Sequence, residues 1–528
     1  MVLPWAAAVL ILFGLWQVAR SEPAGWWYVA AGGALLLSIV TAWSIAPRVP
    51  SGDEPHYLVI AQSLWLDGDL KIQNNHERRD YASYVQSTIP PDYVQRGRDG
   101  EIYSIHAPGT SVIVLPAFLA FGYRGASATV MAASAMTAAL VWLIGWRTTD
   151  SASAAWFGLS ALVTTPTFLL QSATVFPDGL GLAATAVGVY LWVRLHAPGP
   201  PPTPLTVLGA STVLAMMPWL HTRFAIIALC LGTAMLPRLR GRHLAAFLAV
   251  PAVMAAAWFG YFLLIYGTPN PIAPYGGLAT LTSLRFVPGG MLGVLFDQQF
   301  GLIAYSPVLL SVTMGAWAAR GDRLERRLVW TCVAIAVTYL IVATRFWMWW
   351  VGVPAPPARL ATVALPLMAP ALAVAFARSS PRARAGWLTL LAISVAITAV
   401  TVLVDRGALA WNPRDARARW LLWIAPMVDL PRAWPSFFWR LDPFDLSTEW
   451  PFAAHTALYV GIPAMLLSVM TTIAHRREWA LARWQVGLAW WTIGSLVAIA
   501  TIGWWLTGTS GIDVPTVGGD VPTPAEPA

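Results

Sequence analysis

Long apolar runs alternate with short polar connections along most of this chain. A bilayer core about 30 Å thick needs roughly 20 apolar residues per helix. The pair of runs at 205–219 and 222–237 is short for two full crossings, so it also fits one hairpin of two half-helices. The pattern predicts an all-α, polytopic membrane protein of about 12–14 helices. The predicted spans lie near 2–19, 26–46, 125–146, 154–171, 179–196, 205–219, 222–237, 244–266, 302–319, 328–343, 360–378, 386–404, 456–473 and 486–506.

Composition agrees with a membrane protein and excludes several other classes. Only 11% of the 528 residues are charged and 57% are hydrophobic, whereas soluble domains carry about 25% charged residues. The net charge of +8 comes from arginines scattered over short loops, which argues against nucleic-acid binding. Cys230 and Cys332 are isolated within apolar runs and predict neither a disulfide framework nor a metal site. The first apolar run lacks a basic leader and is predicted to be a helix rather than a cleaved signal.

The charges of the connections predict the orientation of the chain. One alternating set is short and rich in arginine, and such connections face the cytoplasm. The other set contains two long loops, 47–107 and 405–455, with most of the acidic residues, and is predicted to face outward. Residues 1–506 are thus expected to form one integral domain of an inner or plasma membrane, followed by a disordered exoplasmic tail, 507–528. The arginines of the first set lie at 20, 147, 194, 238–242, 320–327, 378–384 and 476–483.

Two adjacent carboxylates, Asp53 and Glu54, stand at the start of the first outer loop. Carboxylates at a membrane boundary are costly to desolvate, which makes them functional candidates. A short flat helix is predicted after them, because Pro55 suits a first helical turn. Its apolar face is expected to lie in the headgroup layer, although Asp53 also fits a simple helix cap. That face consists of Tyr57, Ile60, Ala61, Leu64 and Trp65.

The same loop closes on His106, which precedes a second short apolar segment, 109–122. That segment is too short to cross a bilayer and is predicted to be an interfacial or re-entrant helix. Between the two helices, residues 71–101 are polar, and they either fold over the site or stay mobile.

Further polar residues occur at the outward ends of the spans. His221 and Arg223 form a small turn, which indicates either a cavity wall or an arginine that reaches the headgroups. Asp178 fits a helix cap, and Asp297 precedes another helix. The stretch from Arg345 to Arg359 contains Trp349 and Trp350, an arrangement that also fits an interfacial aromatic belt. Arg359 opens a helix behind a proline-stiffened turn, which favours a phosphate ligand.

With these motifs placed, residues 26 to 404 resemble bacterial members of the GT-C superfamily of membrane glycosyltransferases, which includes protein O-mannosyltransferases and aminoarabinose transferases. The motifs that carry the resemblance are Gly52-Asp53-Glu54-Pro55-His56-Tyr57, His106-Ala107-Pro108-Gly109, Trp219-Leu220-His221-Thr222-Arg223, residues 300–307 and residues 349–359. The resemblance implies transfer of a hexosyl or pentosyl group, with inversion, from a polyprenyl-phosphate donor to an exoplasmic acceptor.

The resemblance also implies roles for the candidate residues. Asp53 would be the base toward the acceptor hydroxyl, and Glu54 would orient substrate or a divalent metal ion; no cofactor is otherwise implied. The expected donor-phosphate ligands are Arg359, His106, Arg223 and Arg345. The expected substrate pocket comprises His56, Tyr57, His221, Asp297, Trp349 and Trp350. The chemistry agrees, because glycosyl transfer needs a base and cations for the departing phosphate.

Two other functions share this hydropathy pattern. A flippase or transporter of lipid-linked sugars would place its charges near the middle of the spans, whereas here they cluster at the outer ends. A transferase similar to O-antigen ligases would depend on a late outer loop such as 405–455. The partners expected in the glycosyltransferase interpretation are a polyprenyl-phosphate-linked sugar, the lipid bilayer and an exoplasmic acceptor.

Overall fold

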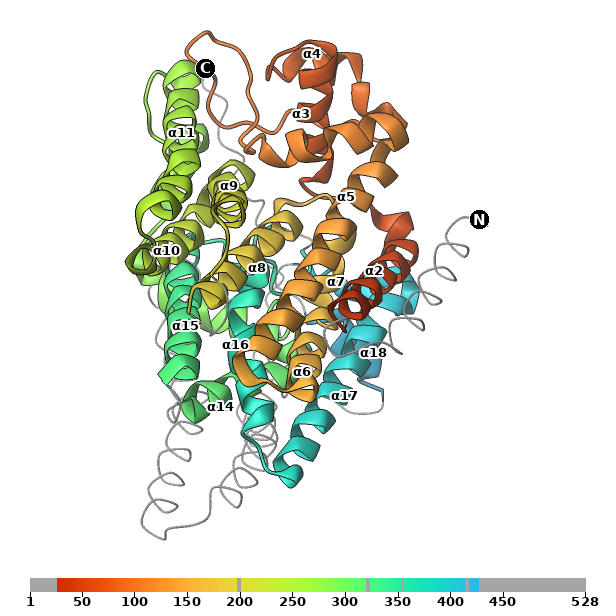
Figure 1. Ribbon diagram of the computed structural model, residues 1–528. Helices are drawn as coiled ribbons and strands as arrows, with labels where there is room; N and C mark the ends of the chain where they lie inside the picture. The colour runs from red at the N-terminus through yellow and green to blue at the C-terminus, as the bar shows by residue number, and fades with distance from the viewer. Residues whose placement is uncertain (1–25, 197–200, 320–322, 353–354, 414–416, 427–528) are drawn as a thin grey trace.

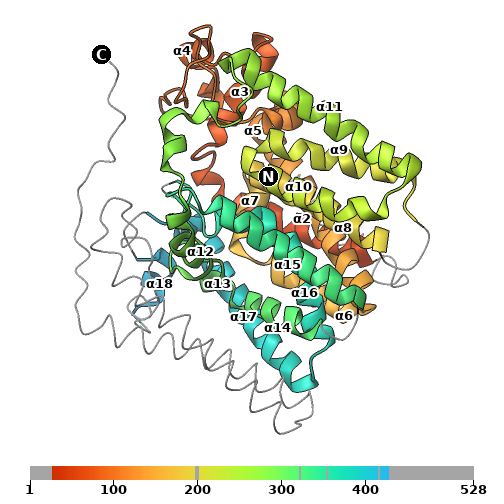
Figure 2. The same cartoon turned by 90° about the vertical axis from the view of Figure 1, so that its left-hand side faces the viewer.

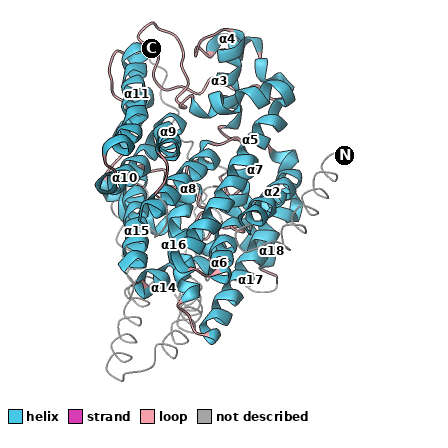
Figure 3. Ribbon diagram, in the orientation of Figure 1, coloured by secondary structure: helices cyan, strands magenta, loops and turns pink. Residues whose placement is uncertain are grey.

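A computed structural model describes residues 26–196, 201–319, 323–352, 355–413 and 417–426, which form a bundle of helices (Figure 1). The described residues contain helices and loops but no strand (Figure 3), so the all-α prediction is confirmed. The α-helices are α2 (Trp26–Ile45), α3 (Glu54–Leu66), α4 (Gln73–Arg78), α5 (Gly109–Thr149), α6 (Ala152–Val163), α7 (Pro166–Ala173), α8 (Pro177–His196), α9 (Pro204–Leu220), α10 (Ala225–Met235), α11 (Gly241–Tyr266), α12 (Val287–Phe296), α13 (Leu302–Tyr305), α14 (Ser311–Ala318), α15 (Arg323–Ala343), α16 (Leu365–Ala377), α17 (Pro381–Leu403) and α18 (Arg419–Ile424). Short 3-10 helices are η2 (Ala46–Arg48), η3 (Asp80–Ser83), η4 (Thr222–Phe224), η5 (Leu236–Arg238), η6 (Ala273–Leu281), η7 (Leu284–Phe286), η8 (Pro307–Leu310), η9 (Arg359–Ala364) and η10 (Val404–Ala410).

The described part of the chain has six helices long and apolar enough to cross a membrane. A seventh is added if α6 and α7, which are bent by 67° at their junction, count as one broken span. The predicted spans 179–196, 205–219 and 222–237 appear as α8, α9 and α10, and 302–319 appears as the broken series α13, η8 and α14. The predicted spans 2–19, 456–473 and 486–506 lie outside the described residues, as do most of the loop 405–455 and the tail 507–528.

The predicted separation of segment 109–122 from the span that follows it is present as a break within α5. Gly122 has φ 61° and ψ −150°, which is not helical, and the chain changes direction there. Only glycine adopts such a backbone at little steric cost. The first part of α5 therefore lies with α3 and α4 at one end of the bundle, whereas the second part runs through it (Figure 1). We call the end that carries α3 and α4 the α3 end.

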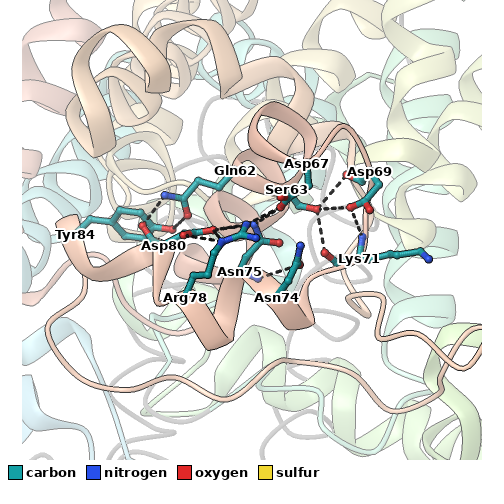
Figure 4. A network of polar contacts seen from close by, with 10 residues as sticks. All are labelled: Gln62, Ser63, Asp67, Asp69, Lys71, Asn74, Asn75, Arg78, Asp80 and Tyr84. Carbon is teal, nitrogen blue, oxygen red and sulfur yellow. Dashed lines mark hydrogen bonds and ion pairs between the residues drawn. The ribbon is translucent and has the colours of Figure 1, made fainter.

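The first long loop folds into a small unit over the α3 end. Its apolar core combines Val59 and Ile60 of α3 with Ile72, Tyr81 and Ile102 of the loop. A polar network surrounds this core (Figure 4). In that network Asn75 donates to both Asp67 and Asp80, at 2.8 and 2.9 Å, and Arg78 pairs with the same two carboxylates. Of the two alternatives for residues 71–101, folding over the site is the one the structure bears out.

The apolar face of α3 contacts protein instead of lipid headgroups. Tyr57, Ile60 and Ala61 are 0–2% exposed, and of the five predicted residues only Trp65 is largely exposed, at 62%. The hydroxyl of Ser111, in the first part of α5, donates to the carbonyl of Tyr57 at 2.7 Å. The expectation that this face lies in the headgroup layer is therefore wrong, because the folded loop and α5 cover it.

The short hairpin of α9 and α10 brings its turn to the α3 end. Gly109, the first residue of α5, lies against the main chain of Trp219, where a Cβ atom would approach the carbonyl oxygen to 2.5 Å. Glycine is therefore required at this contact. The turn that follows Trp219 contains η4 and is thereby placed under the folded loop, while α14 and α17 lie at the opposite end of the bundle (Figure 2).

Candidate active site

Asp53 stands at the N-cap position of α3, but its side chain makes no capping hydrogen bond. Its Oδ2 lies instead 2.6 Å from Nη2 of Arg359, which follows Asp53 by 306 positions in the sequence. Arg359 is the first residue of η9. A capping carboxylate would accept from an N–H of the first helical turn. The interpretation in which Asp53 merely caps α3 is therefore wrong.

Asp53 is the first of four charged groups that alternate in sign. Nε of Arg359 lies 3.4 Å from Oδ2 of Asp178, and Oδ1 of Asp178 lies 2.6 Å from Nη2 of Arg223. Asp178 belongs to the first turn of α8, and Arg223 belongs to η4. Four segments that are distant in the sequence thus meet at one ion-pair series, which we call the charge chain.

The backbone around Arg359 fixes the direction of its side chain. Ala358 has a left-handed conformation, with φ 50°, and its N–H donates to the carbonyl of Phe300 at 2.8 Å. Such a conformation in a residue other than glycine costs about 1–3 kcal/mol and persists only where the surroundings impose it. Nη1 of Arg359 also donates to the carbonyl of Val351 at 3.4 Å, and the guanidinium lies 4.1 Å from the ring centroid of Phe176. Arg359 is therefore held on several sides at once.

Exposure differs sharply along the charge chain. The side chains of Asp178, Arg359 and Arg223 are 0%, 6% and 13% exposed, whereas that of Asp53 is 33% exposed. Buried charges persist only when they are paired, and the two arginines and Asp178 satisfy that condition. Burial raises the pKa of Asp53, but the charge and hydrogen bond of Arg359 outweigh burial and hold it well below its usual value. Asp53 is thus an ionised carboxylate at the solvent-facing end of a buried charge series.

Glu54 has a different environment from its neighbour. It is fully buried, and its carboxylate accepts from Tyr123 Oη at 2.7 Å, from Val175 N at 2.7 Å and from Ser51 N at 3.0 Å. Burial raises its pKa to about 7, although these hydrogen bonds act in the opposite direction. Glu54 therefore links the start of α3 to α5 and to the connection between α7 and α8.

His56, Tyr57 and His106 form an aromatic group next to Asp53. The ring of His106 lies 4.7 Å from that of Tyr57 and 5.9 Å from that of His56, between ring centroids. Nε2 of His106 lies 2.9 Å from Oδ2 of Asp92. Burial lowers the pKa of His56 to about 4, so this ring is neutral at neutral pH.

The other predicted residues lie in three different settings. His221 accepts from the N–H of Arg223 at 3.3 Å and thus adjoins the charge chain. The carboxylate of Asp297 accepts from the N–H groups of Gln299 and Phe300, at 2.7 and 2.9 Å, which folds the turn that receives Ala358. Trp349 and Trp350 are buried, at 1% and 4% exposure, while Arg345 is exposed and takes no part in the charge chain.

The burial of Trp349 also excludes the interfacial aromatic belt as the explanation of the tryptophan cluster. Its ring packs edge-on against Phe300 at 6.1 Å and against Trp350 at 5.8 Å. A belt residue would instead present its ring to lipid headgroups. The tryptophans therefore support the turn that carries Arg359.

Sequence reasoning missed Asp178, Phe176 and Asp92 as members of the site. The Phe-Pro-Asp sequence at 176–178 is also a helix-start signal, and that local signal hides the pairing of Asp178 with two arginines. Asp92 follows two prolines in a polar stretch, and nothing near it in the sequence indicates His106 as its partner. A buried-charge argument would have found Asp178, because an arginine at membrane depth requires a counter-charge.

No group of three or more His, Cys, Asp or Glu side chains is arranged to hold a metal ion within the described residues. Both carboxylate oxygens of Glu54 already accept hydrogen bonds from protein groups. Asp53 is the member of the predicted metal pair that retains an open side. A divalent ion at these two residues remains a prediction.

Comparison with known proteins gives structural neighbours but no sequence relatives. No protein-family model matches the chain, and no curated protein matches it. Among solved structures, chains of ArnT and of the archaeal oligosaccharyltransferase AglB are similar to this chain.

Three solved structures illustrate this similarity. ArnT from Cupriavidus metallidurans bound to undecaprenyl phosphate has a TM-score of 0.47 and 14% identity, over 93% of this chain and 79% of that one. The apo state of the same enzyme has a TM-score of 0.47 and 16% identity, over 93% and 78%. The oligosaccharyltransferase AglB from Archaeoglobus fulgidus, in complex with an inhibitory peptide and a dolichol-phosphate, has a TM-score of 0.42 and 12% identity, over 74% and 56%. At these scores the similarity concerns the general arrangement of the helices alone. A functional assignment therefore depends on the residues of the site.

Proposed function

We propose that this chain is a membrane glycosyltransferase that moves a sugar from a polyprenyl-phosphate donor to an acceptor hydroxyl at the α3 end. The observation that carries the proposal is the charge chain, in which an open carboxylate, Asp53, adjoins buried arginines. Glycosyl transfer from a phosphate needs a base for the acceptor and cations for the leaving group. Both kinds of group occur within one series of ion pairs.

In the proposed reaction the acceptor oxygen attacks the anomeric carbon as the carbon–phosphate oxygen bond breaks. Asp53 receives the acceptor proton, and the phosphate leaves with the bonding electrons. Arg359 and Arg223 are the cations that would stabilise the phosphate charge, since a guanidinium matches phosphate oxygens bidentately. Attack from the face opposite the leaving group inverts the anomeric configuration.

The ion pair between Asp53 and Arg359 has a consequence for this mechanism. A carboxylate bonded to a guanidinium at 2.6 Å is a weak base, because the pair favours its charged form. A donor phosphate that binds Arg359 would compete for the same N–H groups and weaken their hold on Asp53. Asp53 then becomes a stronger base when the donor is present, while Asp178 retains Arg359 through Nε.

The orientation proposed for the site follows from the distribution of arginines. The connection α16–α17, which is flanked by Arg378, Arg382 and Arg384, lies at the end of the bundle opposite α3 (Figure 1). Arginine-rich short connections face the cytoplasm. We therefore assign the α3 end to the exoplasmic side of an inner or plasma membrane, where a lipid-linked sugar is a suitable donor.

The experiment that tests this proposal compares Asp53→Asn with Asp99→Asn. Asp53→Asn keeps the shape of the side chain but removes its basicity, so we expect transfer to fall by about 10²–10⁴-fold, the usual contribution of a general base. Asp99 is an exposed carboxylate of the same loop, with a 40% exposed side chain, and its variant should retain activity. The measurement is release of free polyprenyl phosphate from a polyprenyl-phosphate sugar, with a cell-envelope extract as acceptor.

Full activity of purified, folded Asp53→Asn protein would contradict the proposed role of this carboxylate. Two alternative functions would give other results. A flippase would move the donor without cleaving it, and a transferase that uses the late outer loop, as O-antigen ligases do, would cleave it independently of Asp53.

A further inference from the structure

Beside Asp53 lies a second acid–base pair, formed by His106 and Asp92. In addition to the 2.9 Å contact between their side chains, the N–H of Ile105 donates to the carbonyl of Asp92 at 3.1 Å. The N–H of His106 donates to the hydroxyl of Ser104 at 3.2 Å. The imidazole is therefore bonded to Asp92, and the main chain that carries it is bonded at Ile105 and at His106 itself.

The pair lies on the face of α3 that begins with Asp53. His56 and Tyr57 follow Asp53 by three and four positions, so the three side chains share one face of the helix. The ring of His106 contacts this face, because its centroid lies 4.7 Å from that of the Tyr57 ring. His106 is 10% exposed and Asp92 is 33% exposed, so the pair connects the surroundings of Asp53 with solvent.

The charges around His106 favour a proton on its ring. Burial lowers its pKa, but the hydrogen bond of Asp92 and the charges of Asp53 and Asp92 outweigh burial and raise it above the usual value, against an opposing effect of Arg359. The pKa of Asp53 shifts in the other direction, because Arg359 holds it well below its usual value. A proton on His106 is thus lower in free energy than a proton on Asp53. Other titratable groups that contact His106 or interact with it electrostatically are His56, Tyr57 and His221.

We propose that His106, oriented by Asp92, is the final acceptor of the proton that leaves the acceptor hydroxyl. The inference rests on the proposed glycosyl transfer and adds the destination of its proton. The acceptor O–H bond breaks, its proton passes through Asp53 to Nδ1 of His106, and the imidazolium loses it to outer solvent before the next turnover. Asp53 regains its charge, and no oxidant or other co-reactant is consumed.

Asp92 is a positioning residue in this scheme. Its carboxylate receives the Nε2–H of the neutral imidazole, which leaves the lone pair on Nδ1, and it stabilises the imidazolium once that forms. The sequence resemblance predicts His106 as a phosphate ligand instead. The contact of Nε2 with Oδ2 of Asp92 at 2.9 Å occupies one ring nitrogen of His106, and the nitrogen that remains can accept a proton.

The test is the pH dependence of donor consumption in His106→Gln, Asp92→Asn and a control, His76→Gln. The wild-type rate should fall as pH drops through the pKa of His106, because a protonated ring accepts no further proton. His106→Gln should lower the maximal rate by about 10²-fold, the low end for an acid–base group, and abolish this limb. Asp92→Asn should shift the limb to lower pH, because the partner that raises the pKa of His106 is lost.

His76 is a matched control because it is a buried histidine of the same loop whose Nδ1 contacts a main-chain carbonyl, that of Ile89, at 3.0 Å. His76→Gln should keep the wild-type profile. If His106→Gln also keeps the wild-type profile and rate while Asp53→Asn is inactive, the proton-acceptor inference is wrong and the proposed transferase stands. Absence of donor cleavage by the wild-type protein would overturn both.

Discussion

Asp53 and Glu54 are adjacent in the sequence, yet their burial and hydrogen bonds differ. Glu54 has no exposed surface, and both of its oxygens are used by donors from other segments. Asp53 shares one oxygen with Arg359 and keeps a third of its side chain exposed. Two carboxylates with contrasting desolvation and hydrogen bonding acquire contrasting pKa values. We therefore propose that Asp53 carries the chemistry and that Glu54 positions α3.

This assignment predicts a pH-dependent stability that Glu54→Gln removes. Burial raises the pKa of Glu54 in the folded protein from 4.5 to about 7. The protonated side chain therefore stabilises the folded state fully below the pKa of the unfolded state. This stabilisation is lost as pH rises through the pKa of the folded state. The loss amounts to a few kcal/mol, since one pKa unit corresponds to about 1.4 kcal/mol. The unfolding temperature of the wild-type protein in detergent should fall as pH rises between these two values. The unfolding temperature of Glu54→Gln should fall less over the same range. Equal slopes for the two proteins would contradict the buried, titrating carboxylate.

Three residues of the charge chain belong to the short segments α3, η4 and η9, and Asp178 belongs to the first turn of the longer helix α8. Asp178 pairs with residues 45 and 181 positions away, and a local sequence pattern carries no information about partners so distant. The existence of α3 and the break at Gly122 were accessible from the sequence, because capping residues, periodicity and length are local properties. The sequence did not show what covers the apolar face of α3, since hydropathy does not distinguish a protein neighbour from lipid.

The contact of α5 with α9 predicts a sensitivity at Gly109. In Gly109→Ala the new Cβ would meet the carbonyl oxygen of Trp219 at 2.5 Å, so the two segments must separate. Overpacking of this kind typically costs 1–3 kcal/mol, and the movement should also displace Arg223 in the following turn. Gly209→Ala in the same hairpin is a matched control, because nothing lies within 4 Å of its Cβ position. The unfolding temperature and the transfer rate should fall in Gly109→Ala and not in Gly209→Ala. If Gly109→Ala keeps the wild-type unfolding temperature and transfer rate, this packing is contradicted.

At the scale of the whole molecule, the described bundle has the arginine-flanked connection α16–α17 at one end and a folded, carboxylate-bearing loop at the other (Figure 1). Hydropathy and the arginine asymmetry predicted this arrangement, because both act over whole segments. The charge chain arises where the ends of α8, α9 and η9 meet under that loop. In the proposed reaction a phosphate-linked lipid would reach this site from the bilayer, and the acceptor would reach it from solvent past Asp53.

The most direct test of the glycosyltransferase assignment follows the phosphodiester of the donor. Purified protein in liposomes is given a labelled polyprenyl-phosphate sugar and a cell-envelope extract, and the lipid products are separated and quantified. We expect free polyprenyl phosphate to accumulate as labelled sugar appears in the acceptor fraction, with the wild-type protein but not with Asp53→Asn. Donor that crosses the liposome membrane with its phosphodiester intact, at equal rates in both proteins, would contradict the assignment and identify a carrier instead.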